Sequence, residues 1–302
     1  MSEYHNPVML QECIEGLAIK EDGVYVDVTF GGGGHSKEIL KHLGEKGRLF
    51  GFDQDDEARL NAEAIDHSSF TFVQSNFRNL KKFLRLHGVK KIDGLLGDLG
   101  VSSHQINKPE RGFSTRFDGP LDMRMNQSQA TAAVDVLNDY AEKDLHRILG
   151  QYGEVRNAKT LAASICTHRA GARLETIEDL LGILRKHAPR HREFKYFAQV
   201  FQGIRIEVNE EMKALEEMLV QSAEVLDENG RLVIMSYHSL EDRPVKNFIK
   251  NGIFFGEPEK DLFGNVDKPF KGITRKPIIA SDNEIKENNR ARSAKLRIAE
   301  KV

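Results

Sequence analysis

The stretch VYVDVTFGGGGHS, residues 24–36, decides the fold of this chain. Its first half is rich in β-branched residues and predicts a strand, and a helix is predicted to begin at His35 and Ser36. Four glycines, Gly31 to Gly34, join the two. Glycine is needed where the backbone takes a positive φ or comes closer to a ligand than a Cβ allows. A strand, a glycine turn and a helix in this order are typical of the first βα unit of a doubly wound sheet.

A second strand-like run, residues 48–52, ends in Asp53, about twenty residues after the glycines. A carboxylate at that position can accept hydrogen bonds from both hydroxyls of a ribose. NAD and S-adenosylmethionine both carry such a ribose, so this feature alone does not separate them. The dinucleotide fingerprint requires glycine or alanine where Ser36 stands, which disfavours NAD. The alternative, a turn that only joins strand to helix, leaves the spacing of Asp53 unexplained.

Composition limits the class of protein. Of the 302 residues 30% are charged and 39% hydrophobic, and no apolar run approaches the length of a bilayer span, so we expect a soluble protein. No signal peptide is visible, so we expect a cytoplasmic location. Cys13 and Cys166 lie far apart in sequence and are expected to stay reduced. His5, His35 and His104 show no metal-ligand spacing, and we predict no metal site.

Alternating strand and helix patterns predict a parallel α/β sheet. Strands are expected at 24–29, 48–53, 70–73, 92–99 and 231–235, and helices at 58–65, 80–87 and 210–226. An earlier helix, capped by Asn6 and starting at Pro7, is expected to cover one edge of the sheet. Residues 294–300 alternate apolar and charged side chains and predict a closing antiparallel strand. The preceding residues, 264–293, are expected to form an irregular, basic surface segment.

A helical insertion interrupts this pattern. Residues 101–125 show no sustained period, and so long a loop is usually a lid or a binding segment. Helices are then predicted at 133–137, 142–149, 158–168 and 177–187. The α/β pattern is expected to resume at 203–209. We therefore predict an α/β domain over 1–105 and 202–302, and an all-helical insertion over 106–201.

Basic residues gather in this insertion. They are Arg169, Arg173, Arg185, Lys186, Arg190, Arg192 and Lys195. The net charge of −2 excludes a bulk polycation, so nucleic-acid binding would depend on such local patches. Contact with RNA and an ordinary solvated helical face both remain open interpretations.

Asp98, at the end of the fourth predicted strand, is the residue that we expect to carry chemistry. A carboxylate that accepts an N–H from an exocyclic amine localises its lone pair and orients it toward a sulfonium methyl. Asp98 can equally stabilise the positive charge of the cofactor itself. Phe77 offers a flat surface to adenine, or else is a core residue. His238 either hydrogen-bonds a base or phosphate or has a structural role, and the absence of a G-x-S-x-G elbow argues against hydrolysis.

Eight motifs carry a resemblance to a known family. They are HNPVMLQE (5–12), DVTFGGGGHS (27–36), GFDQD (51–55), DLGVSSHQ (98–105), RGFSTRFDGPLDMRM (111–125), RIEVNEE (205–211), SYHSLEDRPVK (236–246) and NNRARSAKLRIAEK (288–301). Together they resemble the ribosomal RNA small subunit methyltransferase H family. These bacterial enzymes methylate N4 of a cytosine in the decoding region of 16S rRNA, with S-adenosylmethionine as donor.

The resemblance implies a Rossmann-like class I methyltransferase fold, a helical insertion that helps to recognise RNA, and 16S rRNA in the small ribosomal subunit as partner, with no role for DNA or membranes. It places Gly33, Gly34 and His35 at the methionine end of the cofactor and Asp53 at its ribose. It places Phe77 and Asp98 around adenine and sulfonium, with Gln105 just beyond.

The ring that stacks on the target base is left open by the sequence. DNA amino-methyltransferases carry Pro-Pro-aromatic after the acidic or polar residue of the fourth strand, whereas Leu99-Gly100-Val101 follows Asp98 here. Candidates for stacking are Phe113, Phe117, Tyr237 and His238. Two other functions stay open: a NAD-dependent dehydrogenase, disfavoured by Ser36, and an RNA-binding ribosome-assembly factor without catalysis, which does not explain Asp53 and Asp98.

Overall fold

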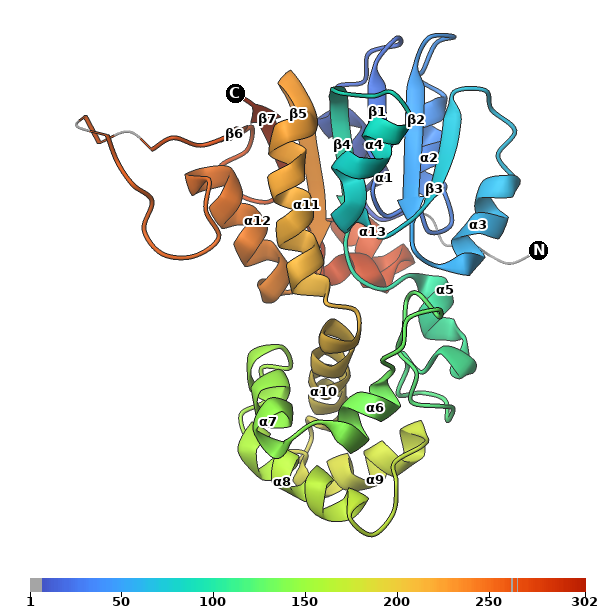
Figure 1. Ribbon diagram of the computed structural model, residues 1–302, viewed down its shortest axis with the longest axis vertical. Helices are drawn as coiled ribbons and strands as arrows, with labels where there is room; N and C mark the ends of the chain where they lie inside the picture. The colour runs from blue at the N-terminus through green and yellow to red at the C-terminus, as the bar shows by residue number, and fades with distance from the viewer. Residues whose placement is uncertain (1–6, 262, 265) are drawn as a thin grey trace. The chain divides into compact units, whose positions relative to one another are not determined.

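The computed structural model describes residues 7–261, 263–264 and 266–302. They form two compact units (Figure 1). The α/β unit comprises the chain up to Gly100 together with Met212–Val302, and the helical unit comprises Val101–Glu211. The expected limits of the insertion, 106 and 201, both lie inside the helical unit. Each unit has a hydrophobic core of its own.

The α/β unit is built on a seven-stranded sheet with strand order β3-β2-β1-β4-β5-β7-β6. The strands are β1 (Val24–Asp27), β2 (Arg48–Asp53), β3 (Phe70–Gln74), β4 (Ile92–Asp98), β5 (Leu226–Ser236), β6 (Phe270–Gly272) and β7 (Lys295–Lys301). The first five are parallel, and β7 runs antiparallel to β5. This arrangement confirms the predicted fold class. The strand order reverses at β1, and in such sheets ligands bind beyond the carboxyl ends at that point.

Helices cover both faces of the sheet (Figure 1). One face carries α4 (Leu80–Leu86), α11 (Glu211–Val225) and α12 (Ser239–Asn251), and the other carries α1 (Leu10–Leu17), α2 (Gly34–Leu40) and α13 (Asp282–Glu287). Near the β3 edge, α3 (Asp56–Glu63) packs its alanines on aromatic rings. Adjacent strand residues alternate between the two layers, as Val26 and Tyr25 do on β1. A three-layer core follows directly from this period of two.

The segment before the last strand is more ordered than we expected. Residues 264–293 include strand β6, which pairs with β7, helix α13, and the 3₁₀ helix η3 (Asn289–Ser293). Phe270 on β6 is fully buried and packs with Phe248. The prediction of an irregular surface segment is therefore wrong over these elements, because one buried aromatic in a polar sequence is enough to seat a short edge strand.

Helix α1 begins later than predicted. Its N-cap is Met9, in the left-handed region with φ of 49°, and the Met9 N–H donates to Glu284 Oε1 of α13 at 2.6 Å. Pro7 therefore does not occupy the first helical position. The expected cap, Asn6, lies outside the described residues.

The helical unit contains no strand among its residues. Its helices are α5 (Ser103–Asn107), η2 (Pro109–Arg111), α6 (Ala133–Asp139), α7 (Glu142–Gln151), α8 (Ala158–Arg169), α9 (Ile177–His187) and α10 (Glu193–Val208). Apolar faces of α6 to α10 meet in one core. Four of these helices agree closely with the ranges predicted from helical periodicity.

Residues 203–208 depart from prediction, because they form the last turns of α10 and not the start of an α/β element. Alternation of Ile204, Ile206 and Val208 imitates a strand, but all three are buried on a helix that is covered on most sides. Gly203 lets α10 approach another backbone: a Cβ there would lie 2.9 Å from the Gly153 nitrogen. Close helix packing, which periodicity does not record, decides this segment.

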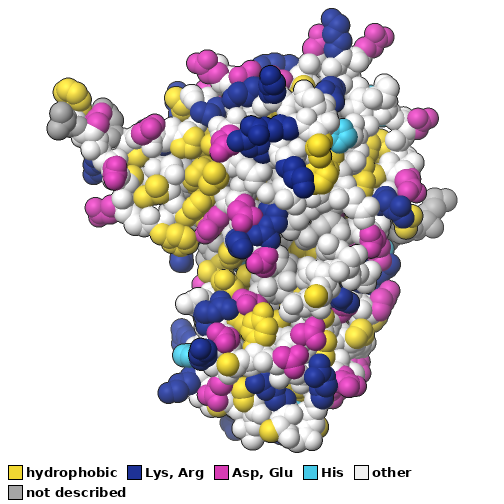
Figure 2. Space-filling view, in the orientation of Figure 1, with side chains coloured by type: hydrophobic (Ala, Val, Ile, Leu, Met, Phe, Trp, Pro, Cys, Tyr) yellow, Lys and Arg dark blue, Asp and Glu magenta, His cyan; other side chains and the backbone are white. Residues whose placement is uncertain are grey.

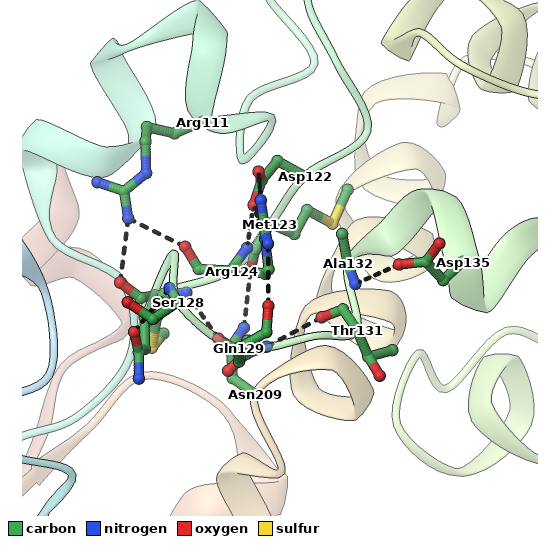
Figure 3. Close-up of polar contacts among 12 residues, drawn as sticks. Arg111, Asp122, Met123, Arg124, Ser128, Gln129, Thr131, Ala132, Asp135 and Asn209 are labelled. Atoms are coloured by element: carbon green, nitrogen blue, oxygen red, sulfur yellow. Dashed lines mark hydrogen bonds and ion pairs between the residues drawn. The ribbon is translucent and has the colours of Figure 1, made fainter.

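The long segment 101–125 is held by polar contacts within the helical unit (Figure 3). Arg111 is buried, and its Nη2 donates to the carbonyls of Arg124 at 3.0 Å and Met125 at 3.2 Å. Asn209 donates to the Met123 carbonyl at 2.8 Å and accepts the Met125 N–H at 2.7 Å. Two short helices, α5 and η2, also form within it. The segment is thus a structured part of the helical unit over most of its length.

Phe270 provides a test of the C-terminal segment. Phe270→Ala should lower the free energy of unfolding of the α/β unit by about 3–5 kcal/mol, because it removes a buried ring and leaves a cavity. Urea unfolding followed by circular dichroism measures this change. Phe255→Ala, at a side chain that is 74% exposed, is the matched control and should change stability by less than about 0.5 kcal/mol. Equal effects of the two substitutions would contradict the placement of Phe270.

Candidate active site at the switch point of the sheet

The glycine turn after β1 has a geometry that side chains would prevent. Gly31 and Gly33 have φ values of 52° and 73°. A Cβ at Gly33 would lie 2.8 Å from the Phe30 ring, and a Cβ at Gly34 would lie 2.3 Å from Cγ of Pro7. The turn therefore needs glycine at these positions for its own packing. It leaves a bare backbone at the carboxyl end of β1, where a ligand can approach closely.

Asp53, at the end of β2, is tied to this turn. Its Oδ2 accepts the Gly31 N–H at 2.8 Å and its Oδ1 accepts the Asp55 N–H at 2.9 Å. The pKa of Asp53 is raised to about 6, mainly by burial. The two hydrogen bonds lower this pKa, and the charges of Asp55 and Asp27 raise it. Each carboxylate oxygen can accept more than one hydrogen bond, so the group remains able to take a hydroxyl donor.

Asp27, the last residue of β1, belongs to the same site and was not singled out from the sequence. Its side chain is buried, with Oδ2 accepting the Ser36 hydroxyl at 2.7 Å and Oδ1 accepting the Thr29 N–H at 3.1 Å. Burial raises its pKa above the ordinary range. An aspartate at the end of an apolar strand was the available signal for Asp27, and Asp98 was selected on the same signal.

Asp98 lies at the end of the adjacent strand β4. Its N–H donates to Thr29 Oγ1 at 2.6 Å, and its Oδ1 accepts the Tyr237 hydroxyl at 2.7 Å. Burial raises the pKa of Asp98 to about 6, with Asp27 and Glu241 adding to the rise and His35 and Tyr237 opposing it. The pKa of Tyr237 is raised well above its usual value by burial and by Asp98, so the phenol keeps its proton and acts as the donor.

His35 is buried in the first turn of α2, and its Nε2 donates to the Val8 carbonyl at 3.1 Å. The carbonyl can only accept, so the ring proton sits on Nε2. This bond ties α2 to the residues before α1. The predicted residues Gly33, Gly34, His35, Asp53 and Asp98 are thus brought together beyond β1, β2 and β4.

The site carries an excess of negative charge. Of the residues that the structure describes, no Lys or Arg pairs with Asp27, Asp53 or Asp98. No three His, Cys, Asp or Glu side chains in the described ranges are placed to hold a metal ion. Asp27 is buried and Asp53 and Asp98 are half-buried, and three such acids without a counter-cation are costly to ionise. Such a cluster suits an organic cation as ligand.

His238 and Glu241 follow β5. His238 is the N-cap of α12, and its Nδ1 accepts the Glu241 N–H at 3.3 Å. Nε2 must then carry the ring proton of the neutral form. This buried Nε2 lies 3.2 Å from Glu241 Oε1, but without the direction of a hydrogen bond. Glu241 Oε2 also accepts the Tyr237 N–H at 2.8 Å, so this pair fixes the turn that carries Tyr237.

The remaining predicted residues have varied surroundings. Phe77 is half-buried in the 3₁₀ helix η1 (Phe77–Asn79), directly after β3, and also contacts the core. Gln105 is in the helical unit and completes a capping box with Ser102 at the start of α5. Phe113 is buried in the core of the helical unit, and Phe117 is 42% exposed with Arg116 5.7 Å from its ring centroid.

The family of this chain follows from comparison with known proteins. The model described as the MraW methylase family matches residues 2–302. This chain belongs to that family. No helix among the described residues of this methylase is long and apolar enough to cross a membrane.

Curated relatives carry the name ribosomal RNA small subunit methyltransferase H, and three of them illustrate the similarity. The protein of Cytophaga hutchinsonii is 58% identical over 298 residues, 99% of both chains. That of Flavobacterium johnsoniae is 56% identical over 99% of this methylase and 98% of its own chain, and that of Parabacteroides distasonis is 53% identical over the same shares. These relatives confirm the predicted resemblance. A solved putative rRNA methylase of Clostridium thermocellum covers 99% of this chain with a TM-score of 0.46 and 15% identity, and the fold assignment rests instead on the strand order.

The raised pKa of Asp98 predicts how stability depends on pH. The folded state binds the Asp98 proton more tightly than the unfolded state does, so this group destabilises the fold as pH rises from about 4 to above 6. Without ligand, Asp98→Asn should therefore be more stable than the parent by about 1–2 kcal/mol at pH 7.5 and equally stable at pH 4. Thermal unfolding across this range measures the difference.

Asp66→Asn, at an exposed carboxylate, is the control and should show no such dependence on pH. A stability difference for Asp98→Asn that does not change with pH would contradict the burial of this charge.

Proposed function

We propose that this chain transfers a methyl group from S-adenosylmethionine to the exocyclic N4 of a cytosine in the decoding region of 16S rRNA. The observation that carries the proposal is Asp98, a carboxylate at the switch point whose Oδ1 is held by the Tyr237 hydroxyl at 2.7 Å. Family membership supports methyl transfer, and the names of the relatives support ribosomal RNA as substrate.

The residues of the site fit S-adenosylmethionine. Asp53, which holds the Gly31 N–H, would accept the ribose hydroxyls, and the Gly33–Gly34 backbone would lie along the methionine part. When bound, this donor supplies a methyl group on a positively charged sulfur. The three unpaired acids Asp27, Asp53 and Asp98 stabilise that charge, and the cation in turn keeps them ionised. Phe77, half-buried after β3, would offer its ring to adenine.

Asp98 is proposed to orient the amine. Among the described residues no protein donor reaches Asp98 Oδ2, so this oxygen is available for an N–H of the base amine. Accepting that hydrogen bond localises the nitrogen lone pair and directs it at the methyl carbon. The new N–C bond forms as the S–C bond breaks, and the nitrogen then loses a proton. Asp98 can take this proton, because its pKa of about 6 leaves it ionised at neutral pH.

His238 is proposed to contact the substrate. Its Nε2–H has no acceptor with hydrogen-bond geometry among the described residues, whereas its Nδ1 is fixed by the Glu241 N–H. A carbonyl of the base or a phosphate oxygen would satisfy the Nε2 donor. Tyr237, whose hydroxyl is engaged by Asp98, is better suited to positioning that carboxylate than to moving freely as a stacking ring.

The substrate is proposed to be the small ribosomal subunit, in the cytoplasm. The test is methyl transfer from labelled S-adenosylmethionine to purified small subunits that lack the modification, with naked 16S rRNA in parallel and the product nucleoside identified by mass. N4-methylcytidine formed on the particle supports the reaction, the atom and the substrate together. Tight donor binding without transfer to either RNA would refute the proposal in favour of an assembly factor.

Asp98→Ala should reduce the rate constant of methyl transfer by about 10²–10⁴-fold, because the amine loses its acceptor. Donor binding, measured by calorimetry, should weaken by less than about tenfold, since Asp53 and the turn remain. Asp66→Ala, at an exposed aspartate, is the activity control. A loss confined to donor affinity would assign Asp98 to the cofactor instead of the amine.

Tyr237→Phe should move the acidic limb of the pH–rate profile to higher pH. The phenol hydrogen bond lowers the pKa of Asp98, so its removal raises that pKa and protonates the carboxylate at a higher pH. The plateau rate above pH 8 should change less than the rate at pH 6. A uniform loss at all pH values would indicate that Tyr237 has only a structural role.

A further inference from the structure

The seven Lys and Arg residues between positions 169 and 195 of the helical unit fall into two groups. Arg169 donates to the carbonyls of Leu137 at 2.7 Å and Tyr140 at 2.6 Å, which fastens α8 to the end of α6. Arg173 lies within ion-pair distance of Asp135 and Asp139. Arg185 forms a bidentate pair with Glu178 on the same helix. These three arginines are engaged within the protein.

The other group has no such engagement. It consists of Lys186, Arg190, Arg192 and Lys195, and we call residues 186–195 the basic segment. All four side chains are exposed, and none forms an ion pair or a hydrogen bond with the residues that the structure describes. The one acid of the segment, Glu193, accepts the His191 N–H with its Oε1 at 3.2 Å. The four cations are therefore close in sequence and uncompensated.

This local excess contrasts with the near balance of charge in the chain. The chain has a net charge of −2, and on the face drawn in Figure 2 basic and acidic side chains are largely interspersed. A polyanion is therefore not held by the protein as a whole. A short run of unpaired cations supplies a local site for phosphate groups.

Phe194 lies between Arg192 and Lys195 near the end of the basic segment, on the first turn of α10. Its side chain is 85% exposed, whereas Tyr196 and Phe197 on the same helix are buried in the core. A large aromatic ring left in water between cations on both sides is typical of a platform on which a nucleobase stacks. Stacking needs only the flat face of a base, so it does not depend on sequence.

The segment is anchored before any ligand binds. The Tyr196 hydroxyl donates to Asn157 Oδ1 at 3.0 Å, and Asn157 Nδ2 donates to the His187 carbonyl at 3.2 Å. The Arg192 N–H donates to the Pro189 carbonyl at 3.1 Å, which closes the turn between α9 and α10. A ligand that binds here does not have to order the backbone first, which lowers the entropic cost of binding.

We propose that the basic segment is a binding surface for single-stranded RNA, with Phe194 stacked on a base and Lys186, Arg190, Arg192 and Lys195 at neighbouring phosphates. This deepens the proposed function, on which it rests for the class of polymer, by naming the surface that holds the substrate strand. A protein partner fits less well, since the segment has four unpaired cations and, among its residues, a single exposed aromatic side chain. Splayed bases in RNA loops match both features.

The test is fluorescence anisotropy of a labelled single-stranded oligoribonucleotide with the full-length protein, without methyl donor, over a range of salt concentrations. Phe194→Ala should weaken binding about 5- to 100-fold at every salt concentration and leave the salt slope unchanged, because stacking releases no counterions. Arg190→Ala with Arg192→Ala should instead lower the magnitude of the slope by about 1.4, since each single-strand phosphate contact contributes about 0.7.

Matched controls are Phe255→Ala, at a 74% exposed ring, and the double variant Lys46→Ala with Lys90→Ala, at two exposed lysines of the α/β unit. Both should bind RNA as the parent does. Parent-like affinity and slope in the variants of the basic segment would overturn the proposal. So would a loss of self-association in Phe194→Ala, measured by sedimentation, with RNA binding intact, because the surface would then join copies of this chain.

The assay separates this inference from the proposed function, because binding is measured without methyl transfer. Variant effects on RNA binding in a protein that methylates no ribosomal RNA would support the surface and refute the reaction. If the protein methylates ribosomal RNA but the variants of the basic segment bind RNA as the parent does, the reaction is supported and the binding surface is refuted.

Discussion

The turn after β1 ties together the ends of three strands. Its Thr29 hydroxyl accepts the N–H of Asp98 from β4, and its Gly31 N–H donates to Asp53 of β2. Because these bonds involve backbone or short side chains, they fix both acids with little freedom. Glycine is required here since a Cβ would collide with Phe30 or Pro7. The positions of the Asp53 carboxylate and of the Asp98 backbone depend on this small set of contacts.

The same contacts concentrate charge at a cost to the fold. Asp27, Asp53 and Asp98 are all shifted toward the protonated form, mainly by burial. A protein selected for stability alone would place a cation or apolar groups there. Retaining three unpaired acids at the switch point is the pattern expected where a ligand supplies the missing positive charge. Tyr237 offsets part of the cost by donating to Asp98.

Much of this arrangement could be read from the sequence, where local pattern and tertiary structure agree. Strands β1 to β5 were visible because each is an apolar run bounded by turn residues, and Asp53 and Asp98, which end β2 and β4, marked the ligand side of the sheet. Helix α9 was predicted to the residue, since Thr176 caps it and its apolar stripe is regular.

The features that the sequence did not predict have physical reasons. Strand β6 depends on one buried ring in a polar segment, and residues 203–208 imitate a strand because a helix buried on most sides loses its 3.6-residue period. The bond between Tyr237 and Asp98 joins residues 139 positions apart, and no single sequence records such pairing. The division of the basic residues into paired and unpaired groups was likewise invisible, because it depends on where Asp135, Asp139 and Glu178 lie.

The insertion also has a consequence for how this chain reaches its folded state. Strand β4 pairs with β5 in the register Leu95 with Leu232, and the whole helical unit lies between them in sequence. Closing so long a loop costs conformational entropy before the pairing of β4 with β5 can stabilise the sheet. Because Val101–Glu211 has a core of its own, it can collapse as an independent folding nucleus and shorten the effective loop. The insertion then sets the order of events during synthesis. Strands β4 and β5 pair only after the helical unit between them has been synthesised.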